Sequence, residues 1–368
     1  MSAELTVAEL TVVVPTFNER SNLVEFLRRL DETLAGIAWE CVFVDDDSPD
    51  GTADLAREIA RGDPRVRCLQ RIGRRGLSSA CIEGMLSSSA SYLAVMDADL
   101  QHDESLLPSM LARLRGGDAD VVVGSRYLEG EDVPGWEVGR LRMSRIATSL
   151  AHRMLRAEVT DPMSGFFMLR RQAFTGAVRR LSGIGFKILL DLLASSPTPL
   201  RVVELPYRFR ERHAGESKLD NRAVQDFLLL LIDKAVGRWV PARFVLFAAV
   251  GGLGVFVHVA VLATAFGWLG RSFLVGQATA TLVAMTFNFA LNNEFTYRDR
   301  RLRGLAWARG LLSFALACSI GVLANVGIAN QLYREDVPWL LSALAGIAVG
   351  VVWNYAVTAV YTWRDPHN

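Results

Sequence analysis

The sequence predicts an α/β domain with a mostly parallel sheet, followed by an α-helical transmembrane domain of four spans. In the first part of the chain, short apolar runs alternate with amphipathic segments, the pattern of a parallel sheet covered by helices on both faces. After about Arg243, long apolar segments dominate. A chain of 368 residues is long enough for two or more domains. We expect domains over residues 1–222 and 242–368, joined by an interfacial helix or linker over residues 223–241.

The charges of the chain are nearly balanced, with 40 Lys and Arg against 39 Asp and Glu. This argues against nucleic acid as a partner, because no basic surplus is available to neutralise phosphates. The four cysteines are scattered without a C-x-x-C spacing, which predicts reduced thiols rather than a zinc site or a disulfide framework. The first nine residues carry two glutamates and no basic residue, so we expect no secretory signal peptide.

Five strands are predicted in the first domain, at residues 10–14, 39–44, 66–70, 91–96 and 119–123. Helices are expected from residue 23, at 53–59 and at 77–87. Acidic and turn residues follow several strands at their carboxyl ends, where open α/β sheets bind ligands. A nicotinamide-binding domain shares this alternation but needs G-x-G-x-x-G after its first strand. Here Pro15-Thr16-Phe17-Asn18-Glu19 stands at that place, which argues against hydride transfer.

Two carboxylates, Asp97 and Asp99, follow the fourth strand. In an extended backbone, residues i and i+2 point to the same side, so the pair can present two hard oxygen ligands to one Mg²⁺ or Mn²⁺ ion. Such an ion would neutralise the charge on a nucleotide leaving group. The alternative is that the pair only caps the next helix, since Asp103 lies nearby and a turn must form. Together with the Asp46 carboxylate and the Phe17 ring, the pair suits a sugar nucleotide.

Six motifs occur in order along the first domain. They are Pro15-Thr16-Phe17-Asn18-Glu19, Val44-Asp45-Asp46-Asp47-Ser48-Pro49-Asp50-Gly51-Thr52, Asp97-Ala98-Asp99-Leu100-Gln101-His102, Gly124-Ser125-Arg126-Tyr127, Asp161-Pro162-Met163-Ser164-Gly165-Phe166 and Gly215-Glu216-Ser217-Lys218-Leu219. As a set they resemble the motifs of dolichol-phosphate (polyprenyl-phosphate) mannose synthases. These are inverting glycosyltransferases of GT-A fold that transfer mannose from GDP-mannose to a polyprenyl phosphate. The resemblance covers residues 10 to about 222 and implies a GT-A fold.

The resemblance implies a role for each matching residue. Nucleotide contacts are expected at Pro15, Phe17, Glu19, Val44 and Asp46. The metal and diphosphate are expected at Asp97, Ala98, Asp99 and Gln101, with Asp97, Asp99 and Gln101 as ligands of a Mg²⁺ or Mn²⁺ cofactor. The residues expected around the donor phosphates and the reacting centre are Asp99, Arg126, Arg212 and Lys218. Phe17 stands where the family commonly has tyrosine, which keeps the ring but loses a hydroxyl.

The charge of the acceptor indicates which residues should bind it. A polyprenyl phosphate is already an anion at neutral pH, so it needs cations to position it rather than a general base. Arginine suits this task because its fork matches phosphate oxygens. The resemblance selects Arg126, Arg140 and Ser144 as the acceptor-phosphate site, whereas the alternative for any single arginine is a solvated surface charge. The basic residues 208–218 predict either a loop that orders over the nucleotide or a plain solvated loop.

Four apolar segments predict membrane-spanning helices, at residues 244–269, 273–295, 305–332 and 339–363. The connection between the second and third spans carries Arg298, Arg300, Arg301 and Arg303. By the positive-inside rule, both termini and the catalytic domain are expected on the cytoplasmic side of the cell membrane. Residues 143–156 form an apolar stripe with basic flanks, typical of a membrane-surface helix or of an ordinary amphipathic core helix.

The membrane part contains an internal repeat. Phe287-Asn288-Phe289 with Phe295-Thr296-Tyr297-Arg298-Asp299 is echoed by Trp353-Asn354-Tyr355 with Tyr361-Thr362-Trp363-Arg364-Asp365. Two hairpins of the same design are implied. This region resembles the four-span GtrA proteins, which are proposed to help lipid-linked sugars cross the bilayer. Polar residues within the spans, such as Asn288 and Asn354, either join the helices by hydrogen bonds or line a path for a lipid headgroup.

The whole sequence therefore predicts a membrane-bound enzyme that transfers mannose from GDP-mannose to polyprenyl (dolichyl) phosphate with inversion. The expected partners are these two substrates and the lipid bilayer, and the oligomeric state stays open. One alternative keeps the reaction but uses UDP-glucose as donor. The other is a lipid-linked sugar translocator, whose membrane half moves a product that the soluble half delivers.

Overall fold

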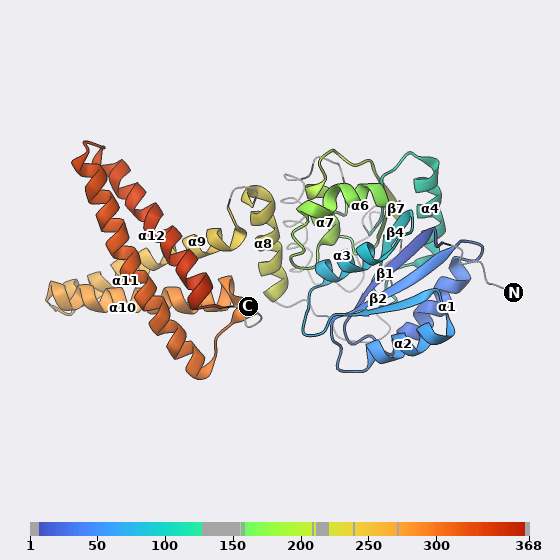
Figure 1. Ribbon diagram of the computed structural model, residues 1–368, viewed down its shortest axis with the longest axis horizontal. Helices are drawn as coiled ribbons and strands as arrows, with labels where there is room; N and C mark the ends of the chain where they lie inside the picture. Colours follow the sequence, from blue (N-terminus) through green and yellow to red (C-terminus); the bar gives the residue numbers. More distant parts are fainter. Residues whose placement is uncertain are drawn as a thin grey trace. The chain divides into compact units, whose positions relative to one another are not determined.

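The computed structural model describes residues 7–126, 155, 159–207, 210, 221–237, 240–270 and 272–364 (Figure 1). The chain divides into two compact units, the first ending at Ala235 and the second beginning at Val236. The predicted surface helix over residues 143–156 lies outside the described residues except for Leu155. The domain boundaries expected at residues 222 and 242 stay a prediction.

A seven-stranded sheet forms the centre of the first unit, in the order β3-β2-β1-β4-β6-β5-β7. The strands are β1 (Leu10–Thr16), β2 (Trp39–Asp45), β3 (Val66–Gln70), β4 (Tyr92–Val95), β5 (Val121–Ser125), β6 (Phe167–Arg170) and β7 (Val202–Pro206). Only β6 runs antiparallel to its neighbours, so the sheet is mostly parallel, as predicted. The sequence analysis missed β6, a short strand that enters the sheet antiparallel between β4 and β5, and β7, a half-exposed edge strand.

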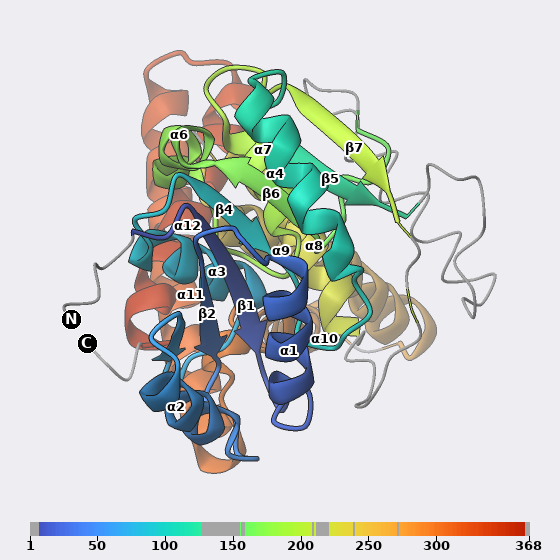
Figure 2. The same cartoon turned by 90° about the vertical axis from the view of Figure 1, so that its right-hand side faces the viewer.

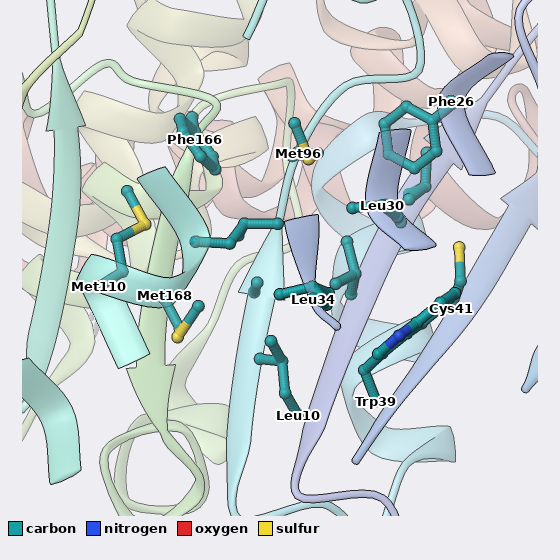
Figure 3. Close-up of a cluster of buried hydrophobic side chains, with 14 of the residues drawn as sticks. Leu10, Phe26, Leu30, Leu34, Trp39, Cys41, Met96, Met110, Phe166 and Met168 are labelled. Atoms are coloured by element: carbon teal, nitrogen blue, oxygen red, sulfur yellow. The ribbon is translucent and has the colours of Figure 1, made fainter. Parts of the chain in front are cut away.

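Helices cover both faces of the sheet. One face carries α1 (Leu23–Thr33), α2 (Thr52–Gly62) and α4 (Leu107–Gly116), and the other carries α3 (Leu77–Ser87), α6 (Arg171–Ala177) and α7 (Ile188–Ser195). In Figure 2, α1 and α4 lie in front of the sheet. Alternate residues of β1 serve the two faces: Val12 belongs to the cluster that contains Phe26 and Leu30 of α1 (Figure 3), and Val13 to the cluster that contains Met85 of α3. Each central strand is therefore buried on both sides, as its apolar sequence predicts.

Strand direction decides where the polar motifs meet. The strands β1 to β5 and β7 all point the same way, so their carboxyl ends lie at one edge of the sheet. Because β6 is antiparallel, its amino end lies at that edge too, and the motif over residues 161–166 precedes it directly. Five of the six sequence motifs therefore gather at this edge, where open α/β sheets bind ligands.

The helix α8 (Asn221–Val236) packs against the first unit. Its Leu230 shares a small apolar cluster with Met163 and Leu190. Lys234 places its Nζ atom 2.6 Å from Oδ1 of the fully buried Asp191. A buried ion pair of this kind connects the helix to the rest of the first unit. The membrane-surface role expected for residues 223–241 stays a prediction.

The second unit consists of long apolar helices. They are α9 (Ala242–Leu262), α10 (Phe273–Leu291), α11 (Gly304–Arg334) and α12 (Trp339–Tyr361), and the π-helical turns η3 (Ala263–Trp268) and η4 (Asn292–Thr296) extend α9 and α10. Within the described residues, four helices are long and apolar enough to cross a membrane. They begin and end close to the four predicted spans.

The two halves of the internal repeat contact each other. Tyr297 and Trp363, which occupy equivalent positions in the repeat, stack with ring centroids 4.2 Å apart and planes inclined by 6°. Asn288 and Asn354, also equivalent, both line one cavity of about 80 Å³. Each of these amides abuts a glycine of the neighbouring helix, so that a Cβ at Gly254 or Gly321 would overlap it. Both hairpins, α9 with α10 and α11 with α12, thus use a glycine to admit an asparagine.

Replacing Gly254 with alanine should therefore destabilise the membrane unit. The new methyl group would overlap the Asn288 amide and push α9 away from α10, which typically costs about 1–3 kcal/mol. Gly252 lies on the same helix and a Cβ there meets nothing within 4 Å, so Gly252→Ala is the matched control. We expect the thermal midpoint of the purified protein to fall only for Gly254→Ala. Equal midpoints for the two variants would contradict the close contact.

Candidate active site

The turn after β1 and the turn after β2 are joined by hydrogen bonds. The backbone N–H of Asn18 donates to Ser48 Oγ at 3.0 Å, and the N–H of Glu19 donates to Thr52 Oγ1 at 3.0 Å. In the sheet, Pro15 pairs with Val44. The residues predicted to contact the nucleotide, which are Pro15, Phe17, Glu19, Val44 and Asp46, thus come from two adjacent strand ends.

Asp46 is almost completely buried, and its carboxylate is held from two sides. Arg71 NH1 donates to Oδ1 at 2.8 Å, and the N–H of Gly76 donates to Oδ2 at 2.6 Å. Burial raises the pKa of Asp46, and the hydrogen bond from Gly76 and the charge of Arg71 only partly offset this effect. Arg71 was not predicted as part of the site. Its position directly after β3, at the same edge as the other motifs, is the signal that could have identified it.

Arg75 is a second residue near the expected site that was not predicted, and it contacts Phe17. The guanidinium carbon of Arg75 lies 4.1 Å from the centroid of the Phe17 ring, a cation–π contact. Arg75 is exposed and Phe17 is half-buried, so this contact lies at the surface of the expected nucleotide pocket.

Asp97 of the acidic pair is held by a chain of two side chains, His102 and Tyr207. Asp97 Oδ2 lies 3.3 Å from Nε2 of His102, whose Nδ1 lies 2.8 Å from the Tyr207 hydroxyl. A carboxylate can only accept, so in a neutral His102 the Nε2 atom donates to Asp97 and Nδ1 accepts from Tyr207. Burial raises the pKa of Tyr207, which keeps this hydroxyl protonated. His102 therefore orients the Asp97 carboxylate through this hydrogen bond.

The other acidic side chains after β4 have distinct roles. Asp99 is buried, and its Oδ1 accepts from the N–H of Gln101 at 3.2 Å. Capping belongs to Asp103, whose Oδ1 accepts from the N–H of Ser105 at the start of η1 (Glu104–Leu106). The alternative in which the acidic pair caps the next helix therefore does not describe the structure. Gln101 Nε2 donates to the carbonyl of Arg210 at 3.1 Å.

The residues of this edge fit a hard divalent cation. Asp97, Asp99 and Gln101 offer carboxylate and amide oxygens, which Mg²⁺ and Mn²⁺ prefer. Among the residues that the structure describes, no three His, Cys, Asp or Glu side chains converge into a complete metal site. A cation bound here would therefore complete its shell with phosphate oxygens and water, the usual arrangement for Mg²⁺. Ala98, between the two acids, is buried.

Arg126 follows β5 and forms a bidentate ion pair with Asp161. Its Nε and NH2 donate to the two carboxylate oxygens at 2.7 and 2.8 Å. Asp161 is fully buried, and its own N–H donates to Glu204 on β7 at 2.9 Å. In the same motif, a Cβ at Gly165 would lie 3.2 Å from Asp97 Oδ2, a tight contact that places Gly165 beside the acidic pair. The motif before β6 thus connects Arg126 with the acidic pair.

The remaining predicted site residues lie outside the described part of the chain. They are Arg140, Ser144, Arg212 and Lys218, and their roles stay predictions. Arg210 is described. Its guanidinium contacts Asp103 and Glu104 at 2.8 Å each, and its N–H donates to the carbonyl of Gln101 at 2.9 Å.

Comparison with known proteins decides the family. The chain is 34% identical over 361 residues to the dolichol-phosphate mannosyltransferase of Pyrococcus furiosus, covering 96% of this chain and 99% of that protein. The chain belongs to the dolichol-phosphate mannosyltransferase family. Members from Mycosarcoma maydis and Saccharomyces cerevisiae are 35% and 34% identical, covering 64% and 65% of this chain and 83% and 91% of those proteins.

Two family models match separate parts of this chain. Glycosyl transferase family 2 matches residues 11–176, and the GtrA/DPMS transmembrane domain matches residues 246–363. The first unit is therefore a GT-A glycosyltransferase domain, and the resemblances stated for both parts of the sequence are confirmed. Together with the four apolar helices, the second match makes the chain a multi-pass membrane protein.

Several functional contacts in this family member escaped the sequence analysis. Arg71, Arg75, Tyr207 and Glu204 were not identified, and Asp161 was quoted only as part of a motif. Arg71 and Tyr207 directly follow β3 and β7, Arg75 lies in the loop between β3 and α3, Asp161 lies in the segment before β6, and Glu204 lies within β7. Their partners are 25 to 105 residues away in the sequence, so only the order of strands brings them together.

The buried Arg126–Asp161 pair allows a test of stability. Asp161→Asn removes the charge that compensates Arg126, and breaking a buried pair costs about 3–5 kcal/mol. The pair between Asp120 and Arg201 is more exposed, so Asp120→Asn should cost less than about 1 kcal/mol. Thermal or denaturant unfolding of the two purified variants measures the difference. Similar losses in the two variants would show that Asp161 does not act through burial of its charge.

Proposed function

We propose that this protein transfers mannose from GDP-mannose to a polyprenyl (dolichyl) phosphate with inversion, giving polyprenyl-phosphate mannose and GDP. The observation that carries the proposal is the gathering of Phe17, Asp46, the acidic pair and Arg126 at one edge of the sheet. Relatives that match nearly the full chain are named dolichol-phosphate mannosyltransferase, which supports the same reaction.

The donor lies across the ends of β1, β2 and β4 in this proposal. The base and ribose take the pocket of Phe17, Glu19 and Asp46, and the diphosphate reaches the acidic pair. Asp97, Asp99 and Gln101 hold a Mg²⁺ or Mn²⁺ ion, which when bound neutralises charge on the departing GDP. His102 and Tyr207 hold the Asp97 carboxylate in place before the donor arrives, so that less rotamer freedom is lost on binding.

The acceptor needs no general base, since a phosphate monoester is already ionised at neutral pH. Its oxygen attacks the anomeric carbon from the side opposite the GDP, which inverts the configuration. Arg126, oriented by Asp161, lies at the end of β5, and we assign the acceptor phosphate to Arg126, Arg140 and Ser144. Arg212 and Lys218 complete the positive charge around the phosphates.

The reaction is assigned to the cytoplasmic face of the cell membrane. Arginines cluster between α10 and α11, at Arg298, Arg300, Arg301 and Arg303, and such clusters stay on the cytoplasmic side. The catalytic domain over residues 1–222 and the segment 223–241 then lie on the same side, beside the bilayer that holds the lipid acceptor.

The donor is identified by thermal stabilisation of the full-length protein with Mn²⁺. A ligand that binds only the folded state at one hundred times its Kd adds about 2.7 kcal/mol to the stability of the unit that binds it. We expect GDP and GDP-mannose to raise the midpoint more than UDP or UDP-glucose. Stabilisation by UDP-glucose alone would instead support the glucosyltransferase alternative.

The role of Asp99 is tested by Asp99→Ala. Losing a ligand of the cation should cost several kcal/mol of transition-state stabilisation, so turnover should fall at least about a hundredfold at saturating metal. The exposed carboxylate of Asp54 on α2 gives the control variant Asp54→Ala, which should keep full turnover. Mannose transfer to dolichyl phosphate in detergent is the measurement. Activity of Asp99→Ala within tenfold of the parent would remove the metal role from Asp99.

A further inference from the structure

The loop between β3 and α3 is held against the nucleotide edge by its backbone. The N–H of Arg71 donates to the carbonyl of Asp45 at 2.8 Å, the N–H of Gly73 donates to Asp47 Oδ2 at 3.1 Å, and the N–H of Gly76 donates to Asp46 Oδ2 at 2.6 Å. The loop is thus fixed at its start, its middle and its end. Nothing in the family comparisons or the sequence motifs assigns it a function.

Two adjacent arginines in this loop have different surroundings. Arg74 forms an ion pair with Glu83 on α3. Arg75 instead places its guanidinium over the Phe17 ring, 4.1 Å from the centroid. The next residue, Gly76, donates to Asp46, so the loop that carries Arg75 contacts both the Phe17 ring and the Asp46 carboxylate.

These three groups match guanine. The guanine ring presents two acceptors, O6 and N7, on one edge, and an arginine fork can donate to both. Its N1–H and N2–H₂ groups are donors on the neighbouring edge and suit a carboxylate. Uracil has no such pair of adjacent acceptors, since its N3–H lies between O4 and O2. Stacking on an aromatic side chain, by contrast, is available to every base.

We propose that Arg75 selects the guanine nucleotide by donating to O6 and N7 of a base stacked on Phe17, with Asp46 accepting from the N1–H and N2–H₂ donors of the neighbouring edge. This inference rests on the proposed GDP-mannose donor and names the residue that distinguishes it from a uridine nucleotide. An exposed cation–π contact is weak, so the entering base can displace the guanidinium from the ring face to its own edge.

The test compares GDP, 7-deaza-GDP and UDP. The deaza analogue keeps the stacking surface and the donors but lacks N7. Calorimetric titration of the full-length protein with Mn²⁺ measures Kd for each nucleotide with the parent, Arg75→Ala, Arg75→Lys and Arg74→Ala. Midpoints of the unliganded variants, equal to that of the parent, establish that they are folded.

We expect the parent to bind 7-deaza-GDP about tenfold more weakly than GDP, within the range of one bidentate base contact. Arg75→Ala should bind GDP about tenfold more weakly, no longer distinguish GDP from the analogue, and leave UDP within about threefold. Arg75→Lys keeps the charge without the fork and should also lose the distinction. Arg74→Ala should behave as the parent.

Each of the other outcomes would overturn one part of the proposal. If Arg75→Ala keeps the affinity for GDP and the penalty for 7-deaza-GDP, Arg75 does not read the base, although the GDP donor stands. If Arg75→Ala weakens GDP and UDP equally, its charge serves the diphosphate and selects nothing. A parent that binds UDP but not GDP overturns the donor assignment together with this inference.

Discussion

The carboxylates buried at the carboxyl edge of the sheet must be hydrogen-bonded, and the donors that satisfy them determine the shape of the site. An unpaired buried carboxylate is far costlier than a paired one. Asp45 accepts from the N–H and hydroxyl of Ser48, which shapes the turn after β2. Asp46 accepts a hydrogen bond from Gly76 in the loop after β3, and Asp161 accepts one from Arg126. A buried carboxylate therefore holds each of these three parts of the site.

The same edge also contains local backbone strain. Among the described residues, non-glycine positions with positive φ include Asn18, Asp47 and Leu100, which follow the ends of β1, β2 and β4. Asparagine and aspartate tolerate this conformation, whereas leucine does not. Leu100 nevertheless adopts φ 63° because its side chain is buried in the core cluster between the sheet and α1 and α4. Apolar packing thus holds the turn that carries Asp99 and Gln101.

Local sequence predicts elements that are long and strongly patterned. The five predicted strands and the four spans all appear, because apolar residues dominate each of them. The place of β6 between β4 and β5 depends on a crossover of the chain, which the local sequence does not show. The same limit applies to the site. Residue types such as the acidic pair are visible in the sequence, whereas the partners Arg71 and Tyr207 are selected by strand order.

In the proposed function, recognition of the donor divides between the plane and the edges of its base. The family commonly has a tyrosine where this chain has Phe17, and loss of the hydroxyl leaves a ring that can stack on any base but cannot choose among them. Selection among the bases then has to come from groups that approach the edges of the base. Asp46 is fixed by two donors and cannot move, whereas Arg75 is exposed and can adjust its position. A fixed acceptor and an adjustable donor would let the proposed site close around a purine without ordering the whole loop on binding.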